Sequence, residues 1–247
     1  HPTCEGVAIG APGYVNPHTG FIEMGGAIRQ FDNFAIKRWL EQQTGLPVAI
    51  ENDANCVLLA ERWQGKAVDM SDFLVLTIGT GVGGAIFCHN QLVHGARFRA
   101  GEFGYMQTER PGARDVRRSS MNENCTMRVL RDRYAGHVGK SLEAVTGEEI
   151  FDRYEAGDAV CQRLVADFFN GLGTGLYNLV NIFDPQAIFI GGGIVERPGF
   201  LALLREHLAW FGIADYLDTV SHGNDAGLMG AVYHFNQQNR SLNGDRS

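Results

Sequence analysis

The chain has 247 residues, 45% of them hydrophobic, enough to bury one large core or two modest ones. Its formal net charge of −7 argues against a broad nucleic-acid-binding surface, and no apolar run approaches the length of a membrane span. The first residues do not read as a signal peptide, and the five cysteines are scattered without C-x-x-C spacing. We therefore expect reduced thiols, a cytoplasmic location, and neither nucleic acid nor a membrane as a partner.

Strands and helices alternate in the first third of the chain. The predicted strand 6–10 lacks alternation, which is typical of a parallel strand covered on both faces. Turn residues dominate 14–34 and predict a hairpin or an ordered loop. Apolar residues at helical spacing predict a helix over 34–43, and a short strand over 48–50 follows. This alternation predicts an α/β fold.

Two polar residues, Asn52 and Asp53, lie where the strand 48–50 ends and precede a predicted helix over 55–64. An aspartate in this position is suited to cap the helix N-terminus. It is equally suited to present a carboxylate at the carboxyl end of a strand, where open α/β sheets bind ligands. Position alone does not separate these roles, and Asp53 can serve in both.

A glycine-dense turn joins two apolar strands in the segment 73–88, with Gly79, Thr80, Gly81 and Gly83 at the turn. Glycine lets backbone N–H groups approach an anion, and Thr80 adds a hydroxyl donor. No Gly-Lys-Ser/Thr follows, as a P-loop requires, and no helix follows, as a dinucleotide fingerprint requires. The turn is therefore either a phosphate-binding hairpin or a plain glycine hairpin.

The rest of the chain alternates loops, helices and one further buried strand. Glu102 lies between two glycines, which suits a tight loop that presents one carboxylate, and 109–120 is expected to be a solvated loop. Glycines within a long predicted helix indicate close packing against another backbone. The remaining predicted elements are helices over 122–134, 148–154, 160–183 and 199–210, a strand over 187–190 that ends in Gly191, Gly192 and Gly193, and a closing helix over 226–237.

Four motifs occur in order along the chain: Glu51-Asn-Asp53-Ala-Asn55, Ile78-Gly-Thr-Gly81-Val-Gly83, Ala100-Gly-Glu102-Phe-Gly104 and Ile190-Gly-Gly-Gly193. In this order and spacing they resemble the repressor–ORF–kinase (ROK) family of sugar kinases. The resemblance covers nearly the whole chain and is closest to members that use ATP to phosphorylate β-glucosides such as cellobiose at the 6-hydroxyl. Ser120–Cys125 and His207–Asp215 carry that closer likeness.

The resemblance implies a two-lobed α/β fold of the actin-like ATPase (ribonuclease H-like) type. The N-terminal lobe would hold residues 1–66, with the closing helix 226–237 returning to it. The C-terminal lobe would hold residues 67–225 and the nucleotide site. The resemblance also implies a small-molecule sugar as substrate, ATP with Mg²⁺ as cofactors, and a homodimer formed through the C-terminal lobe.

The resemblance also implies a role for each motif. Asp53 would be the catalytic base that takes the proton of the sugar 6-hydroxyl. Asn52 and Glu102 would hydrogen-bond sugar hydroxyls, and Glu123 matches a carboxylate that family members place at the start of a helix. The nucleotide would be held by glycine turns at Gly79, Thr80, Gly81 and Gly83 for the phosphates and at Gly191, Gly192 and Gly193 for the adenosine. No residue of this chain is assigned as a metal ligand.

The chain departs from the family pattern at the motif that begins with Glu102. Most members have histidine where this chain has Tyr105, followed by a cysteine-rich zinc loop, whereas residues 110–122 contain no cysteine. We therefore expect no structural zinc. Because the family's histidine also contacts the sugar, Tyr105 is expected to alter the pocket at the C1–C2 edge and to suit a bulky β-substituent at C1.

A second departure concerns the start of the chain. The family opens with an Asp-Ile-Gly-Gly-Thr motif that contacts ATP phosphates and Mg²⁺, and this motif does not occur here. We expect about 50 residues, a three-stranded unit and a helix, to precede His1, leaving the N-terminal lobe of this sequence incomplete. Without them, strand 6–10 would expose an apolar edge, and the 247 residues alone are expected to be inactive and prone to aggregation.

Two other functions remain open on these residues. One is a ROK kinase for glucose or an N-acylmannosamine, against which the missing zinc loop counts. The other is a sugar-responsive transcriptional repressor of the same family. The intact Glu51–Asn55 motif and the acidic charge favour the kinase. No histidine is assigned a role.

Overall fold

The structure is a computed structural model that describes residues 4–110 and 115–244, the segment 240–244 by its backbone alone. The chain divides into two compact units. Unit 1 comprises His1–Val75, Ala85–Gly101 and Val220–Ser247, and unit 2 comprises Leu76–Gly84 and Glu102–Thr219. The sequence-based expectation places residues 1–66 and the closing helix 226–237 in one lobe and residues 67–225 in the other. In the structure the glycine hairpin has its base in unit 1 and its tip in unit 2.

Unit 1 is built on two parallel strands, β1 (Val7–Ala11) and β5 (Val48–Asn52), with Ile9 opposite Ile50. The predicted turn region folds into a small antiparallel sheet of β2 (Val15–Asn16), β3 (Phe21–Ile22) and β4 (Phe34–Ala35). Three helices complete the unit: α1 (Ile36–Thr44), α2 (Asp53–Gln64) and α8 (Ala226–Gly244).

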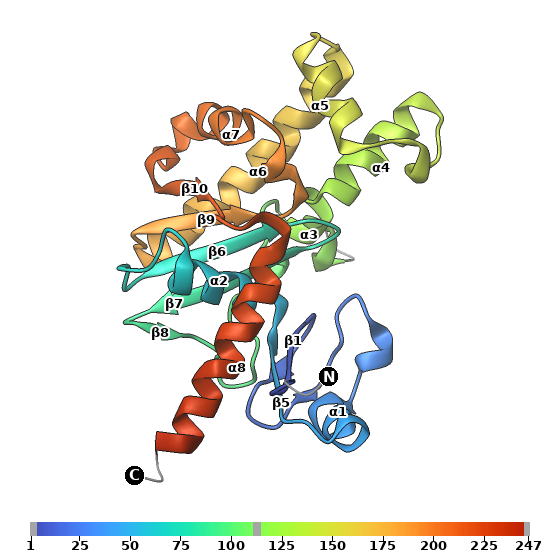
Figure 1. Ribbon diagram of the computed structural model, residues 1–247. Coiled ribbons are helices and arrows are strands. Elements are labelled where there is room, and N and C mark those ends of the chain that lie inside the picture. The colour runs from blue at the N-terminus through green and yellow to red at the C-terminus, as the bar shows by residue number, and fades with distance from the viewer. Residues whose placement is uncertain (1–3, 111–114, 245–247) are drawn as a thin grey trace. The chain divides into compact units, whose positions relative to one another are not determined.

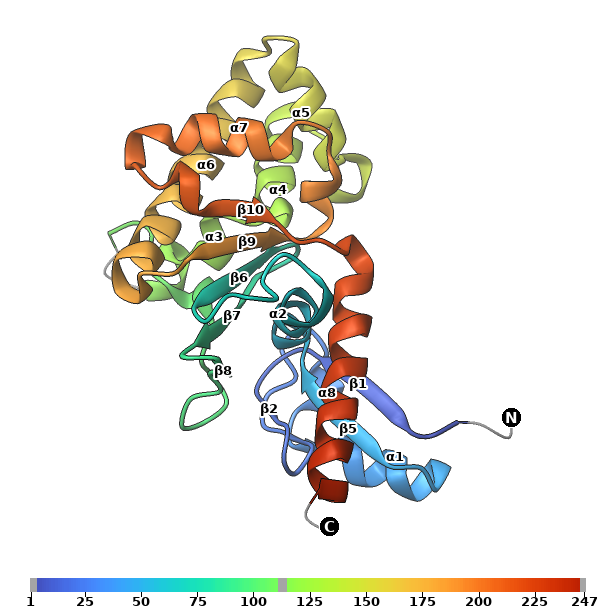
Figure 2. The same ribbon diagram turned by 60° about the vertical axis from the view of Figure 1, so that its left-hand side comes forward.

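Helix α8 packs against α2, β1 and β5, as Figures 1 and 2 both show. The helices touch backbone to backbone: a Cβ on Gly230 would lie within 1.7 Å of the Cys56 carbonyl oxygen. Trp63 and Tyr233 stack across the same contact, with ring centroids 5.4 Å apart. Helix α8, from the end of the sequence, therefore packs against and positions α2, the helix that begins at Asp53. It continues to Gly244, beyond the predicted end at 237.

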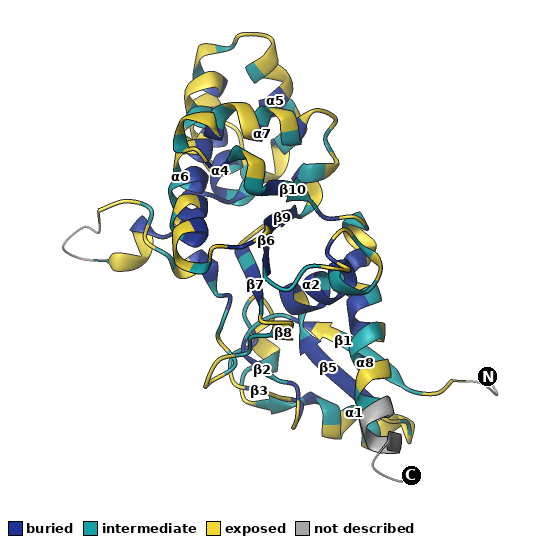
Figure 3. Ribbon diagram, turned by 90° about the vertical axis from the view of Figure 1, so that its left-hand side faces the viewer, coloured by how far each residue is buried: buried dark blue, intermediate teal, exposed yellow. Residues whose placement is uncertain are grey.

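A five-stranded sheet has the order β10-β9-β6-β7-β8. Its strands are β6 (Phe73–Ile78), β7 (Val82–Cys88), β8 (Gln91–Leu92), β9 (Ala187–Gly191) and β10 (Leu217–Thr219). Strands β9 and β10 are parallel, whereas β7 and β8 form an antiparallel hairpin. Strands β5, β6 and β9 are dark blue in Figure 3 because nearly all their residues are buried. Sequence analysis missed β10, which has only three residues.

The helices of unit 2 agree with the predicted ones, except that one predicted helix is divided into two. They are α3 (Met121–Asn124), α4 (Met127–Val138), α5 (Gly147–Glu155), α6 (Ala159–Phe183) and α7 (Phe200–Leu208). The predicted helix 122–134 is split, because Thr126 caps α4 by accepting the Val129 N–H at 3.2 Å. Part of the predicted loop 109–120, residues 111–114, lies outside the described residues, and Val116–Ser119 form a short 3-10 turn.

The glycines of α6 pack against side chains, not against another backbone as predicted. A Cβ on Gly171 would meet the Cys125 sulfur, and one on Gly175 would meet the Met121 sulfur. These glycines make room for side chains rather than for another backbone. In the part of the chain that the structure describes, no helix is long and apolar enough to cross a membrane.

Candidate active site

Asn52, rather than Asp53, caps helix α2. The Asn52 Oδ1 accepts the N–H groups of Ala54 at 2.9 Å and Asn55 at 3.2 Å, while its Nδ2 donates to the Gly13 carbonyl at 3.0 Å. The capping role that sequence analysis considered for Asp53 thus belongs to its neighbour. An amide carries two N–H donors, so Asn52 keeps one for a ligand.

Asp53 is the first residue of α2 and is exposed. One of its carboxylate oxygens, Oδ1, accepts the Ala54 N–H at 2.8 Å. Protein atoms crowded around the carboxylate desolvate it and raise the pKa of Asp53, and hydrogen bonds from the backbone only partly oppose this shift. A carboxylate with a raised pKa at a strand end has the properties of a general base.

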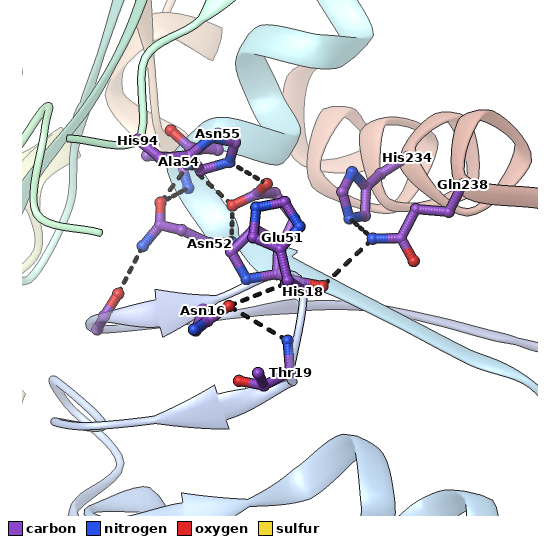
Figure 4. Close-up of polar contacts among 12 residues, drawn as sticks. Asn16, His18, Thr19, Glu51, Asn52, Ala54, Asn55, His94, His234 and Gln238 are labelled. Atoms are coloured by element: carbon purple, nitrogen blue, oxygen red, sulfur yellow. Dashed lines mark hydrogen bonds and ion pairs between the residues drawn. The ribbon is translucent and has the colours of Figure 1, made fainter. Parts of the chain in front are cut away.

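Glu51 adds a buried carboxylate that sequence analysis did not assign (Figure 4). Its Oε1 accepts the Asn52 N–H at 2.7 Å and the Asn55 side-chain amide at 2.9 Å, and its Oε2 lies 2.7 Å from Nε2 of His94. Asn55 is 6% exposed, and its Oδ1 has no hydrogen-bond partner among the described residues. Only the position of Glu51 inside the motif hinted at this cluster, because His94 is 43 residues away.

The glycine turn between β6 and β7 lies in unit 2 and is exposed at Gly79, Thr80 and Gly81. The Gly79 N–H donates to the Gly81 carbonyl at 2.9 Å, so in this conformation it is occupied within the turn. A Cβ on Gly79 would meet nothing within 4 Å, which leaves open space above the backbone. The neighbouring Gly83 is half-buried on β7.

The segment from Glu102 to α3 contains three of the predicted sugar-binding residues and contacts the glycine turn through Asn122. Glu102 is half-buried, and Tyr105, in the 3-10 turn Phe103–Tyr105, is 45% exposed. Glu123 in α3 is exposed and pairs weakly with Arg128 at 3.5 Å. Sequence analysis missed Asn122, whose Oδ1 accepts the Val82 N–H at 2.8 Å and whose side chain lies against Gly104. Asn122 thereby joins the glycine turn to the Glu102 motif.

The second glycine turn, Gly191 to Gly193, follows β9, the neighbour of β6 in the sheet. Gly192 has a φ of 102°, and a Cβ there would lie 2.1 Å from the Ile78 carbonyl oxygen. Only glycine tolerates both conditions. The glycine turns that follow β6 and β9 therefore lie in contact at one end of the sheet.

A pocket of about 440 Å³ opens beside Gly193 in unit 2. This volume is within the usual range for small-molecule sites. Its arginines are already engaged, because Arg131 donates to the Val145 carbonyl at 2.7 Å and Arg197 pairs with Asp152 at 2.8 Å. Three separate segments line the pocket: Met127 and Arg131, Gly147 and Glu148, and Gly193, Ile194, Glu196, Arg197 and Pro198.

One cluster of described side chains could hold a metal ion: Asp72, Cys88 and His89. The Asp72 carboxylate already accepts the Ser71 hydroxyl at 2.6 Å and the His89 N–H at 2.9 Å, as expected in a hydrogen-bonded hairpin end. A thiol and an imidazole do not suit Mg²⁺, which prefers oxygen ligands. This cluster therefore does not fit the expected ion.

The comparisons with known proteins decide the family. The family model described as ROK family matches residues 2–238. The chain belongs to the ROK family. A β-glucoside kinase from Klebsiella pneumoniae is 78% identical to this ROK chain over 246 residues, which cover 100% of this chain and 83% of that protein.

Solved structures agree with this assignment. The structure of the Lmo2764 protein from Listeria monocytogenes matches this ROK chain with a TM-score of 0.92 and 60% identity, covering 96% of this chain and 82% of that one. A ROK family glucokinase from Streptomyces griseus, solved with glucose and AMPPNP, matches with a TM-score of 0.78 and 25% identity, over 93% and 80% of the two chains. The predicted α/β sugar-kinase fold is confirmed.

Proposed function

We propose that this ROK protein is an ATP-dependent kinase that phosphorylates the 6-hydroxyl of β-glucosides such as cellobiose, giving a 6-phospho-β-glucoside and ADP. The observation that carries this proposal is the 78% identity, across the whole chain, to a β-glucoside kinase. The Asp53 carboxylate at the end of β5, whose pKa is raised by desolvation, supplies the base that such a reaction needs.

In this proposal Asp53 is the catalytic base. Its carboxylate accepts the proton of the 6-hydroxyl as that oxygen bonds to the γ-phosphorus and the bond from this phosphorus to the β–γ bridging oxygen breaks. Asn52 donates its remaining amide N–H to a sugar hydroxyl. Phosphoryl transfer needs little covalent help from the protein, so the work of the chain is to position groups and to hold one proton.

Unit 2 supplies the other proposed sugar ligands. Glu102 accepts hydrogen bonds from sugar hydroxyls, and Glu123 does the same from the start of α3. Tyr105 takes the position of the histidine found in most ROK kinases. We propose that it shapes the C1–C2 edge for a bulky β-substituent.

The nucleotide is proposed to bind the two glycine turns of unit 2. The residues fit a nucleotide, because the turn Gly79, Thr80 and Gly81 is exposed, with open space above Gly79, and the pocket beside Gly193 has the volume of a small-molecule site. ATP supplies the phosphoryl group. Mg²⁺ is proposed to accompany it through its phosphate oxygens, and no step is assigned to residues that hold the ion.

We also propose that the protein is cytoplasmic and forms a homodimer. All five cysteines are free, which suits a reducing cytoplasm. A homodimer through unit 2 is supported by an exposed apolar patch of Tyr177 and Trp210, both of which contact the Phe211 ring. Trp210 is 73% exposed, and monomeric proteins seldom leave such patches uncovered.

The experiment that tests the substrate is a comparison of kcat/KM for cellobiose, glucose and N-acetylmannosamine with ATP, on protein expressed from the complete gene. We expect kcat/KM to be higher for cellobiose than for either monosaccharide by roughly tenfold or more. A pocket that contacts the second sugar of cellobiose loses those contacts with a monosaccharide. A preference for glucose would refute the proposed role of Tyr105. Turnover of none of the three, with sugar binding retained, would point to a sugar-responsive repressor.

A further inference from the structure

Glu51 carries a fully buried carboxylate one residue before Asn52 and two before Asp53 (Figure 4). A buried carboxylate is strongly unfavourable unless it is paired and hydrogen-bonded. Burial raises the pKa of Glu51, but the hydrogen bond and charge of His94, with the amides of Asn55 and Asn52, outweigh burial and bring the pKa below its usual value. Glu51 is therefore ionised, and His94 is the side chain that compensates it.

Oε1 of Glu51, the carboxylate oxygen that does not face His94, binds a residue on each side of Asp53. It accepts the Asn52 N–H, which belongs to the strand end before the aspartate. It also accepts the Asn55 side-chain amide, which belongs to the first turn of α2 after the aspartate. A shift of the Glu51 carboxylate therefore moves the peptide that carries the proposed base.

His94 begins the segment 94–101, which leads in the chain directly to Glu102. The segment folds back on its own start, because the Ala100 N–H donates to the His94 carbonyl at 3.1 Å. Phe98 packs edge-on against both His94 and His18, with ring centroids 6.2 Å apart in each pair. The Phe98 φ of 54° is rare for an aromatic residue, so these contacts maintain an unfavourable backbone.

We propose that His94 is a positioning residue for phosphoryl transfer, which acts by fastening the segment 94–101 to the Glu51 carboxylate at the end of β5. This inference rests on the proposed function. This one contact, 2.7 Å between Nε2 of His94 and Oε2 of Glu51, then fixes both the start of α2 around Asp53 and the segment that precedes Glu102. Reacting groups displaced by about 1 Å can lose around 100-fold in rate. The effect is therefore expected in kcat, since His94 acts through Glu51 rather than on the sugar.

The test compares His94→Ala, His94→Gln and the control His137→Ala, in which an exposed histidine of α4 is removed. For cellobiose we expect His94→Ala to lower kcat by about 10- to 100-fold, with a change in KM of less than about threefold. His94→Gln keeps an N–H donor toward Glu51 and should recover most of kcat. His137→Ala should behave like the wild type. Hydrogen exchange of residues 51–56 and 94–101 should accelerate in His94→Ala alone.

The outcomes separate this inference from the proposed function. Wild-type protein that turns over no sugar would refute the proposed function. An active wild type with an unchanged kcat in His94→Ala would refute the positioning role alone. A purely structural role would lower Tm and leave kcat per folded molecule unchanged, and would equally refute it. Loss of kcat in His94→Ala, at a Tm close to wild type and with rescue by His94→Gln, would establish it.

Discussion

Asn52 and Asp53 divide two tasks at the end of β5. Asn52 caps α2 and is bonded to Gly13, which orders the strand end. Asp53 is thereby spared from capping, although its Oδ1 still accepts the Ala54 N–H. Sequence alone could not make this division, because asparagine and aspartate are equally good caps and differ here by one position. The order Asn-Asp thus gives one residue to the helix cap and leaves the next for the proposed role of base.

The pH dependence of turnover follows from the raised pKa of Asp53. The base works when ionised, so activity falls as pH decreases through this pKa, which lies above the usual aspartate value. We expect the acid limb of kcat against pH to lie above the range of an ordinary aspartate. Measurements of kcat from pH 4 to 8, on wild type and Asn52→Ala, would locate this acid limb. An acid limb at or below the usual aspartate pKa would contradict the desolvated environment.

The two helices α2 and α8 show what the sequence can and cannot reveal about an element. Both were predicted from runs of helix-compatible apolar residues that end in polar ones. The family resemblance implied that the closing helix returns to the lobe that contains α2. The contact of Gly230 with Cys56 could not be predicted, since the two residues are distant in the sequence and a single glycine carries no signal about its partner. The same holds for Glu51 and His94, and for the three segments that line the pocket of unit 2.

Replacing Gly230 by alanine should separate α8 from α2. The added Cβ would overlap the Cys56 backbone, and a clash with backbone cannot be relieved by a side-chain rotation. We expect Gly230→Ala to lower the free energy of unfolding by at least about 2 kcal/mol. Urea unfolding followed by tryptophan fluorescence measures this change, because one of the three tryptophans, Trp63, stacks on Tyr233 across the contact.

Gly227→Ala, in the same helix, is the matched control. A Cβ at Gly227 meets nothing within 4 Å. The substitution should leave stability unchanged or raise it by roughly 0.5–1 kcal/mol through helix propensity. If both variants unfolded at the same urea concentration as wild type, the close contact between the helices would be refuted.

At the scale of the whole molecule, the ordered motifs predicted the fold class and the family, and the comparisons confirm both. The extent of the units was harder to predict, because residues 85–101 return to unit 1 in the middle of the chain. No local pattern in a sequence records such a return. Each of the two strand–glycine turns could be predicted from the sequence, because a glycine cluster directly after an apolar strand marks a tight turn locally.

The proposed dimer gives a prediction at this scale. Trp210→Glu places a charge in the apolar patch of Tyr177, Trp210 and Phe211, and we expect it to convert a dimer into a monomer in sedimentation velocity experiments. Leu228→Glu is the control, because Leu228 in α8 is 69% exposed but belongs to unit 1. A dimer that persists in Trp210→Glu and dissociates in Leu228→Glu would place the interface elsewhere.

The central claim is that Asp53 is the base of a β-glucoside kinase, and turnover of cellobiose by Asp53→Asn tests it most directly. We expect kcat to fall by roughly 100- to 10,000-fold, the usual contribution of a general base. Because the folded state raises the pKa of Asp53, ionised Asp53 opposes folding above that pKa, so Tm at pH 7 should be no lower in Asp53→Asn than in wild type. Turnover within tenfold of wild type would contradict the account.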